Sequence, residues 1–308
     1  MRTSYWIVLT LAISAVCLVP AIATSRESLS LSFGVYTSDK PTVMYRKFKP
    51  ILGFLEKHLR NNLKKPVKIK LQIFNSYESA IKALVDEEVD FVRFGTASYV
   101  LAKRENPEIT LLAVEESRGK RRSDGVIFCR SDRSIQSLGD LKGKTFAFGD
   151  QNSTIGRYLS QAELVKAGVH AGDLSRFEYL GRHDLVVTAV LHERFDAGAA
   201  KEGTFLKYKD RGLRAVARFD NVTKPWVARE GLTDKTLSSL REGLLGAKDS
   251  KVLTSIGRNI SGFGTVEDSE YEFVRQGMDR AKEFETGSTA SPSRATAAAE
   301  KRGRSGEK

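Results

Sequence analysis

The residues best suited to chemistry lie in one strand-to-helix turn, where residues 145–157 read T-F-A-F-G-D-Q-N-S-T-I-G-R. The first four are apolar β-formers, and a Gly-Asp turn follows them. Asn152, Ser153 and Thr154 then stand where a helix over residues 155–167 should begin. The first amides of a helix lack partners and carry the positive end of the helix dipole, so hydroxyls beside them can bind a phosphate-like anion. The same residue types are also preferred helix caps, and an ordinary cap remains the alternative.

A second chemistry open to these residues is nucleophilic catalysis. Ser153, His183 and either Asp184 or Asp196 contain the parts of a hydrolase triad. A nucleophilic serine usually lies on a strained Gly-x-Ser-x-Gly elbow, which the N-S-T run does not form. The sequence therefore favours binding over catalysis, and we expect no enzyme activity.

The N-terminus indicates export. Arg2 precedes a long apolar stretch, and the run A-I-A ending at Ala23 is a small-x-small cleavage pattern. Residues 1–23 are thus expected to be a signal peptide that directs the protein to the periplasm, with an uncleaved membrane anchor as the alternative. Cleavage would leave Cys129 as the one cysteine, so no intramolecular disulfide is expected. The four histidines show no metal-ligand spacing, and we expect neither a metal nor a cofactor.

The net charge of +12 is spread widely along the chain. It is compatible with a solvated surface and with attraction to anionic ligands. No zinc-finger spacing or aromatic RNA-binding pattern accompanies it, so nucleic acid is not an expected partner. Residues 286–308 are rich in Ser, Thr, Ala, Gly and Lys and are expected to form a disordered basic tail.

Strands and helices alternate through the rest of the chain. Apolar and β-branched patterns predict strands over residues 30–36, 67–74, 89–94, 109–114, 125–129, 145–148, 177–180, 195–199, 213–219 and 225–228. Helical spacing predicts helices over residues 44–59, 77–85, 96–103, 137–141, 155–167, 184–192, 233–245, 250–256 and 269–284. This alternation is typical of α/β layers with largely parallel strands. The near-apolar strands at residues 126–129 and 215–219 are candidate hinge crossings between two lobes.

Several short motifs occur in a characteristic order. They are F-G-T-A-S-Y from Phe94, L-G-D-L-K-G-K from Leu138, F-G-D-Q-N-S-T from Phe148, G-R-H-D from Gly181, F-D-A-G from Phe195 and D-S-E-Y from Asp268. Over residues 31–281 the chain resembles the periplasmic phosphate, phosphite and phosphonate-binding proteins of ABC transporters. The resemblance implies an α/β fold of the two-lobed, type II-like periplasmic binding protein class. Two mixed sheets would be joined by a hinge, with the ligand cleft between the lobes. Residues 28–118 and 222–285 would form the first lobe, and residues 125–218 an inserted second lobe.

The resemblance also implies a ligand site. Ser153 and Thr154 would contact phosphoryl oxygens through hydroxyls and amides, and His183 would be a donor from a facing turn. Tyr77 and Phe94 would form an aromatic wall on the first lobe. The complete set of expected ligand-binding residues is Tyr77, Phe94, Thr96, Asn152, Ser153, Thr154, Ile155, His183 and Glu202.

The chain departs from the family pattern at several of these positions. Ile155 stands where many members have a serine, so the amide is kept and a hydroxyl is lost. Phe94 cannot donate the hydrogen bond that a tyrosine would. Lys201 would repel an ammonium group on the ligand, and Glu202 could restore such a site only by pointing into the cleft.

The function that we expect is capture of a phosphonate-, phosphite- or phosphate-like oxyanion for an inner-membrane ABC permease, by a monomer whose lobes close on the ligand. Two alternatives remain open at this point. The protein could be the ligand-binding component of a sensory system, or it could bind another small anion or a thiamine-precursor-like ligand in the same fold.

Overall fold

The computed structural model describes residues 28–36 and 41–287. The expected signal peptide lies outside the described residues, and so does the expected tail beyond residue 287. The first tail residue, Thr286, is the last residue of a helix. None of the helices in the described ranges is long and apolar enough to cross a bilayer.

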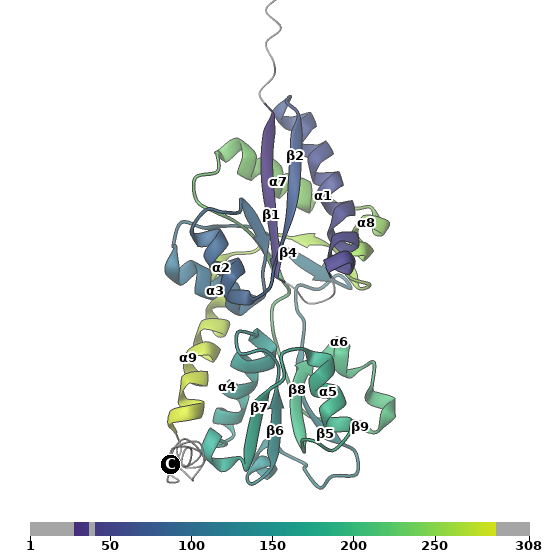
Figure 1. Cartoon of the computed structure of the whole chain (residues 1–308), viewed down its shortest axis with the longest axis vertical. Coiled ribbons are helices and arrows are strands. Elements are labelled where there is room, and N and C mark those ends of the chain that lie inside the picture. Colours follow the sequence, from purple (N-terminus) through teal and green to yellow (C-terminus); the bar gives the residue numbers. More distant parts are fainter. Residues whose placement is uncertain (1–27, 37–40, 288–308) are drawn as a thin grey trace, which may run out of the picture.

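Two sheets stand one above the other along the long axis of the molecule (Figure 1). In the described part of the chain, the first lobe has a six-stranded sheet in the order β11-β4-β10-β3-β1-β2, and the second a five-stranded sheet in the order β7-β6-β8-β5-β9. The first sheet contains β1 (Leu29–Tyr36), β2 (Val67–Phe74), β3 (Phe91–Arg93), β4 (Thr110–Ser117), β10 (Pro225–Ala228) and β11 (Ile260–Gly264). The second contains β5 (Gly125–Arg130), β6 (Thr145–Phe148), β7 (Arg176–Tyr179), β8 (Ala197–Lys201) and β9 (Leu213–Phe219).

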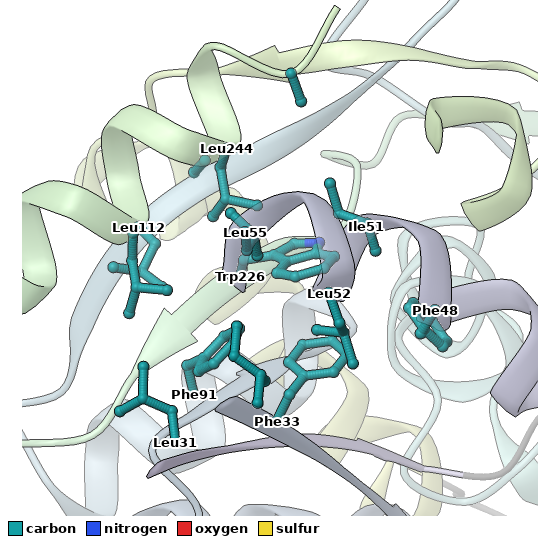
Figure 2. Packing of buried hydrophobic residues seen from close by; sticks show 14 of the residues in the cluster. Leu31, Phe33, Phe48, Ile51, Leu52, Leu55, Phe91, Leu112, Trp226 and Leu244 are labelled. Atoms are coloured by element: carbon teal, nitrogen blue, oxygen red, sulfur yellow. The ribbon is translucent and has the colours of Figure 1, made fainter. Parts of the chain in front are cut away.

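Helices cover both faces of the first sheet. One face carries α1 (Pro41–Leu63), α7 (Asp234–Leu245) and α8 (Ser250–Ile256), and the other α2 (Tyr77–Val85) and α3 (Thr96–Glu105). The apolar residues of α1 that recur at helical spacing are all buried, namely Phe48, Ile51, Leu52, Leu55 and Leu59. They pack around Trp226 of β10, whose ring stacks on Phe33 at a centroid distance of 4.7 Å (Figure 2). This burial of large apolar side chains is the main stabilising contribution to the lobe.

The second lobe has the same layered plan. Helix α4 (Leu159–Lys166) packs on one face of its sheet, and α5 (His183–Leu191) and α6 (Glu202–Phe205) pack on the other. The last helix of the described residues, α9 (Glu272–Thr286), joins α4 on its face.

The order of the predicted elements is confirmed, and the strand over residues 67–74 and the helix over residues 77–85 have the expected bounds. The two sheets are mixed, as the resemblance implies, whereas the expectation of largely parallel strands was too simple. Strand β10 runs antiparallel to β3 and β4, and β5 runs antiparallel to β8 and β9. Strand β11 was not predicted, because I-S-G-F-G reads as a glycine-rich turn and its pairing with β4 is a long-range contact. The expected helix at residues 137–141 is a short 3₁₀ turn over Leu138–Leu141.

Two adjacent chain segments cross between the lobes (Figure 1). They pair with each other, since the Ser123 amide donates to the Asn221 carbonyl at 2.7 Å and the Thr223 amide to the Arg121 carbonyl at 3.0 Å. The candidate hinge strands at residues 126–129 and 215–219 are therefore not the crossings themselves. They are neighbours inside the second sheet, and the crossings lie immediately before the first and after the second.

Helix α9 belongs to neither lobe alone. Its first half contributes Val274 and Met278 to the core beneath the first sheet, and Phe284 near its end belongs to the core of the second lobe. Next to Met278, Gly277 lies so close to α4 that a Cβ there would be 2.5 Å from Leu159. The expected assignment of residues 222–285 to the first lobe therefore does not describe the second half of α9, which runs beside α4 (Figure 1).

Candidate ligand-binding site

A cavity of about 180 Å³ lies between the two lobes beside the hinge, and side chains of both lobes line it. Five of the expected ligand-binding residues are among its lining residues: Tyr77, Thr96, Ser153, Thr154 and Ile155. The first two come from the beginnings of α2 and α3 and the other three from the turn after β6, so the cavity lies where several strands end.

The turn after β6 begins its helix in an unusual way. A π-helical turn over Thr154–Tyr158 precedes α4, in place of the regular helix that was expected over residues 155–167. Ser153 is the N-cap, and its hydroxyl oxygen accepts the Gly156 amide at 3.0 Å. The capping interpretation is thus correct, yet the hydroxyl proton is still available to donate. Single π turns frequently occur at functional sites.

Two glycines hold the turn against the strand. The Gly149 amide donates to the Gly156 carbonyl at 2.8 Å. A Cβ on Gly156 would be 2.9 Å from both Gly149 Cα and Ser153 Oγ, so neither the strand end nor the capping serine leaves room for a side chain there. This close backbone approach fixes Ser153 at the cavity wall.

Thr154 connects the lobes directly. Its hydroxyl oxygen accepts the Ala97 amide of α3 at 2.9 Å and lies 3.2 Å from the Thr96 hydroxyl, which donates to Asn221 Oδ1 at 2.8 Å. Thr154 is in the second lobe, Ala97 and Thr96 are in the first, and Asn221 is in the hinge. The lobes are therefore in contact at the cavity, which is the closed arrangement of a hinged pair.

Two stacked tyrosines form the aromatic wall. The rings of Tyr36 and Tyr77 lie 4.0 Å apart with an angle of 22° between their planes. Burial raises the pKa of Tyr36 to about 12 and that of Tyr77 well above its ordinary value, so both hydroxyls stay protonated and can donate. The Tyr77 hydroxyl also contacts the Ser153 hydroxyl. Gly95 allows this wall to approach, because a Cβ there would be 2.8 Å from the Tyr36 hydroxyl.

The wall beside the hinge is charged. Arg93, at the end of β3, pairs through two nitrogens with the carboxylate of Glu115 on β4, and the Nη2 contact is 2.7 Å. Trp226 Nε1 donates to the same carboxylate at 3.1 Å. Glu115 is only 2% exposed, so this bidentate pair compensates for its burial.

Two lysines add further positive charge. Lys201 ends β8, and Lys224 lies in the hinge just before β10. Burial, followed by the charges of Lys201 and Arg93, holds the pKa of Lys224 well below its ordinary value. His183 begins α5 near both lysines, and burial, followed by their two charges, holds the pKa of its imidazole well below its ordinary value. At neutral pH His183 is therefore uncharged, and its buried Nδ1 has no hydrogen-bond partner among the described residues.

Four expected residues are not on the cavity lining. His183 begins α5 close enough to Lys201 and Lys224 for their charges to act on it, but it is not among the lining residues. Phe94 is fully buried and points away between two lining neighbours, because adjacent residues near a strand end face opposite sides. Asn152 is half-buried in the turn, where its amide donates to Asp150 Oδ1 at 2.8 Å. Glu202 forms an ion pair with Arg218 and does not create the ammonium site that was considered.

The sequence reasoning missed other lining residues. Tyr36 takes the place expected for Phe94 in the aromatic wall, and Arg93 and Lys224 are charged lining residues that were not expected. The position of Tyr36 at the end of an alternating strand was a usable signal for it. Lys224 had no such signal, since it is one basic residue among many. Within the described ranges, no group of three or more metal-ligating side chains occurs.

With this geometry established, comparisons with known proteins identify the family. A family model for the periplasmic substrate-binding protein of phosphonate ABC transporters matches residues 33–271. The chain belongs to this family. Its fold of two mixed sheets is that of periplasmic binding proteins, and proteins of the family bind substrates for transport.

Two curated relatives show the similarity in sequence. A probable phosphite-binding protein, PhnD1 of Prochlorococcus marinus, is 28% identical over 178 residues, which is 55% of this chain and 57% of that protein. The phosphate-import protein PhnD of Mycolicibacterium smegmatis is 23% identical over 56% of this chain and 54% of its own. The chain thus spans little more than half of the curated relatives that it matches.

Solved structures agree in fold over a greater length. PhnD1 in complex with methylphosphonate superposes with a TM-score of 0.67 at 22% identity, covering 82% of this chain and 98% of that one. The protein XAC2383 of Xanthomonas citri, bound to chloride, gives 0.72 at 22% identity, covering 82% and 99%.

Proposed function

We propose that this protein binds a small phosphonate, phosphite or phosphate-like oxyanion in the cavity between its lobes and delivers it to an ABC permease. One observation carries the proposal. The capped π turn brings Ser153, Thr154 and Ile155 to a cavity whose other walls offer protonated tyrosine hydroxyls and positive charge. Neutral donors and nearby cations together are what a phosphoryl group requires.

The roles of the individual residues follow from their positions. Ser153 donates its proton to a phosphoryl oxygen, and Tyr36 and Tyr77 donate from the facing wall. Thr154 fastens the closed lobes, so that closure and ligand binding are coupled. The protein acts as a periplasmic monomer after removal of residues 1–23, and its serine has a binding role and no catalytic one.

The size of the cavity supports a small ligand. At roughly 30 Å³ per water molecule, 180 Å³ corresponds to about six waters, well below the ~300–1,000 Å³ of sites for drug-sized molecules. An inorganic oxyanion or a phosphonate with a short substituent fits this volume.

Calorimetric titration with phosphate, phosphite and methylphosphonate tests the proposal. We expect at least one of them to bind, and Ser153→Ala to weaken that binding about tenfold, because a charge-assisted hydrogen bond is lost. Ser137→Ala is the matched control, since Ser137 is also an N-cap of the second lobe but does not line the cavity.

Ser153→Ala should lose about 0.5–2 kcal/mol of stability, which is typical of a lost cap, because the Ser153 hydroxyl accepts the Gly156 amide. The proposal fails if none of the three anions at ~1 mM raises the melting temperature. It also fails if the two variants bind equally well, or if the protein hydrolyses an activated phosphoester.

A further inference from the structure

The charges along the cavity are unequally compensated. Glu115 is the buried carboxylate of the hinge-side wall, and it is committed to Arg93 and Trp226 by the hydrogen bonds described above. Two of these hydrogen bonds end on Oε1 and one on Oε2, and no hydrogen bond or ion pair joins this carboxylate to Lys224 among the described residues. Glu115 therefore neutralises Arg93 and attracts Lys224 only at longer range.

Lys224 is a cation of this wall that the Arg93–Glu115 pair does not neutralise. Among the described residues, no hydrogen bond or ion pair holds its ammonium, and its recorded contact is with the Tyr36 ring, 5.5 Å from the centroid. A half-buried ammonium with only a cation–π contact is poorly compensated. Lys201 and Arg93 both repel it, as the direction of its pKa indicates. An anion beside Lys224 would compensate this charge.

The position of Lys224 separates it from the oxyanion donors. Ser153 contacts the hydroxyl of Tyr77, Tyr77 stacks on Tyr36, and Lys224 contacts Tyr36. Ser153 and Lys224 thus approach different rings of the aromatic wall, one from the second lobe and one from the hinge. A ligand along this wall would offer the phosphoryl group to Ser153 and its other end to Lys224.

We propose, on the basis of the oxyanion-binding function above, that the preferred ligand is a short phosphonate carrying a second anionic group, such as a carboxylate, and that Lys224 binds that second group. The class is that of phosphonocarboxylates, with one or two carbon atoms between phosphorus and carboxylate oxygen. An ammonium substituent is disfavoured at the same place by the same charge. Lys224 is thereby a specificity-determining residue of the cavity.

The test compares three ligands of related shape by calorimetric titration: methylphosphonate, phosphonoacetate and 2-aminoethylphosphonate. The wild-type protein should bind phosphonoacetate at least about tenfold more tightly than methylphosphonate, and 2-aminoethylphosphonate more weakly than either. Lys224→Met keeps the length and apolar stem of the side chain. It should weaken phosphonoacetate about tenfold or more and methylphosphonate by less than about threefold, so that the preference disappears.

Lys209→Met is the matched control. Lys209 is exposed on the second lobe and does not line the cavity, and its loss changes the net charge equally. It should leave all three affinities as they are. The ligand-free Lys224→Met protein should also melt at a higher temperature than the wild type, because a poorly compensated buried charge is removed. This second measurement shows in addition that the variant folds.

The possible failures are distinguishable. If methylphosphonate binds but phosphonoacetate binds no better, or if Lys224→Met weakens both equally, Lys224 serves the phosphoryl group alone and the proposal of a second anionic group is wrong. If the wild type binds none of the phosphonates, phosphate or phosphite, the proposed function itself is wrong.

Discussion

At the scale of single residues, the site combines neutral donors with charges that tune one another. Ser153, Tyr36 and Tyr77 are neutral at physiological pH. Burial, followed by the charges of Lys201 and Lys224, lowers the pKa of His183. The consequence is a histidine that is kept neutral by its surroundings. Its neutral ring can donate from one nitrogen and accept at the other.

The lowered pKa of His183 predicts a pH dependence of stability. The unfolded chain binds a proton at this histidine below about pH 6.5, whereas the folded protein does not until the pH is much lower. Below pH 6.5 the unfolded state therefore binds more protons, and the free energy of unfolding falls as the pH falls, by up to about 1.4 kcal/mol per pH unit for this group. Above pH 6.5 it makes no contribution.

Denaturant unfolding of wild type and His183→Asn between pH 5 and 7.5 measures this effect. Asparagine does not titrate, so the variant should lose less stability than the wild type between pH 6.5 and 5. Carboxylates contribute equally to both proteins, which leaves the difference to His183. Parallel pH profiles of the two proteins would contradict the assignment.

At the scale of elements, the sequence predicts most of what burial and periodicity determine. The helix over residues 44–59 and the strand over residues 67–74 are defined by apolar spacing, and both are found. Strand β11 was not predicted from the sequence, because its pairing with β4 and not its own composition makes it a strand. The π turn was not predicted either. It depends on the close approach of Gly149 to Gly156, which no local propensity indicates.

Part of the site was predictable in the same sense. Ser153 and Thr154 follow a strand in a cap-like motif, so their exposure to the cavity could be inferred. Lys224 could not be, because its importance arises from the fold bringing the hinge, β3 and β4 together. The position of the Glu202 side chain could not be inferred from the sequence, because its ion pair with Arg218 of β9 is a contact that the fold creates.

The close contact between Gly149 and Gly156 gives a prediction at the scale of elements. Gly156→Ala places a methyl group 2.9 Å from Gly149 Cα, where backbone must move, and should cost about 1–3 kcal/mol of stability. The shift displaces Ser153 as well, so methylphosphonate binding should weaken. Gly53→Ala is the control, because Gly53 is exposed in α1 with no atom within 4 Å of a new Cβ, and it should stabilise the protein by up to about 1 kcal/mol. Chemical denaturation measures the stability of both variants, and calorimetric titration measures their affinity for methylphosphonate. A Gly156→Ala protein with wild-type stability and affinity would contradict the close packing of Gly149 and Gly156.

At the scale of the whole molecule, the lobes are joined in three ways. The paired crossings form the hinge, α9 packs on both lobes, and Thr154 bonds across the cavity. The paired crossings and the packing of α9 do not require the lobes to meet at the cavity. The third exists only when the lobes meet, so it is the contact through which a ligand can bias the open and closed states.

Thr154→Val separates this role from direct ligand contact. Valine has nearly the same shape but no acceptor, so the Ala97 amide loses its partner in the closed state and is hydrated in the open one. An unpaired buried amide costs about 1–3 kcal/mol, which corresponds to an affinity roughly 5- to 150-fold weaker. Small-angle scattering supplies the decisive measurement, because the variant should have a larger radius of gyration than the wild type at equal methylphosphonate concentrations. Thr154→Ser restores the acceptor and should restore closure. If the valine variant loses affinity while its scattering follows the wild-type curve at matched occupancy, Thr154 acts on the ligand and the lobes close without it.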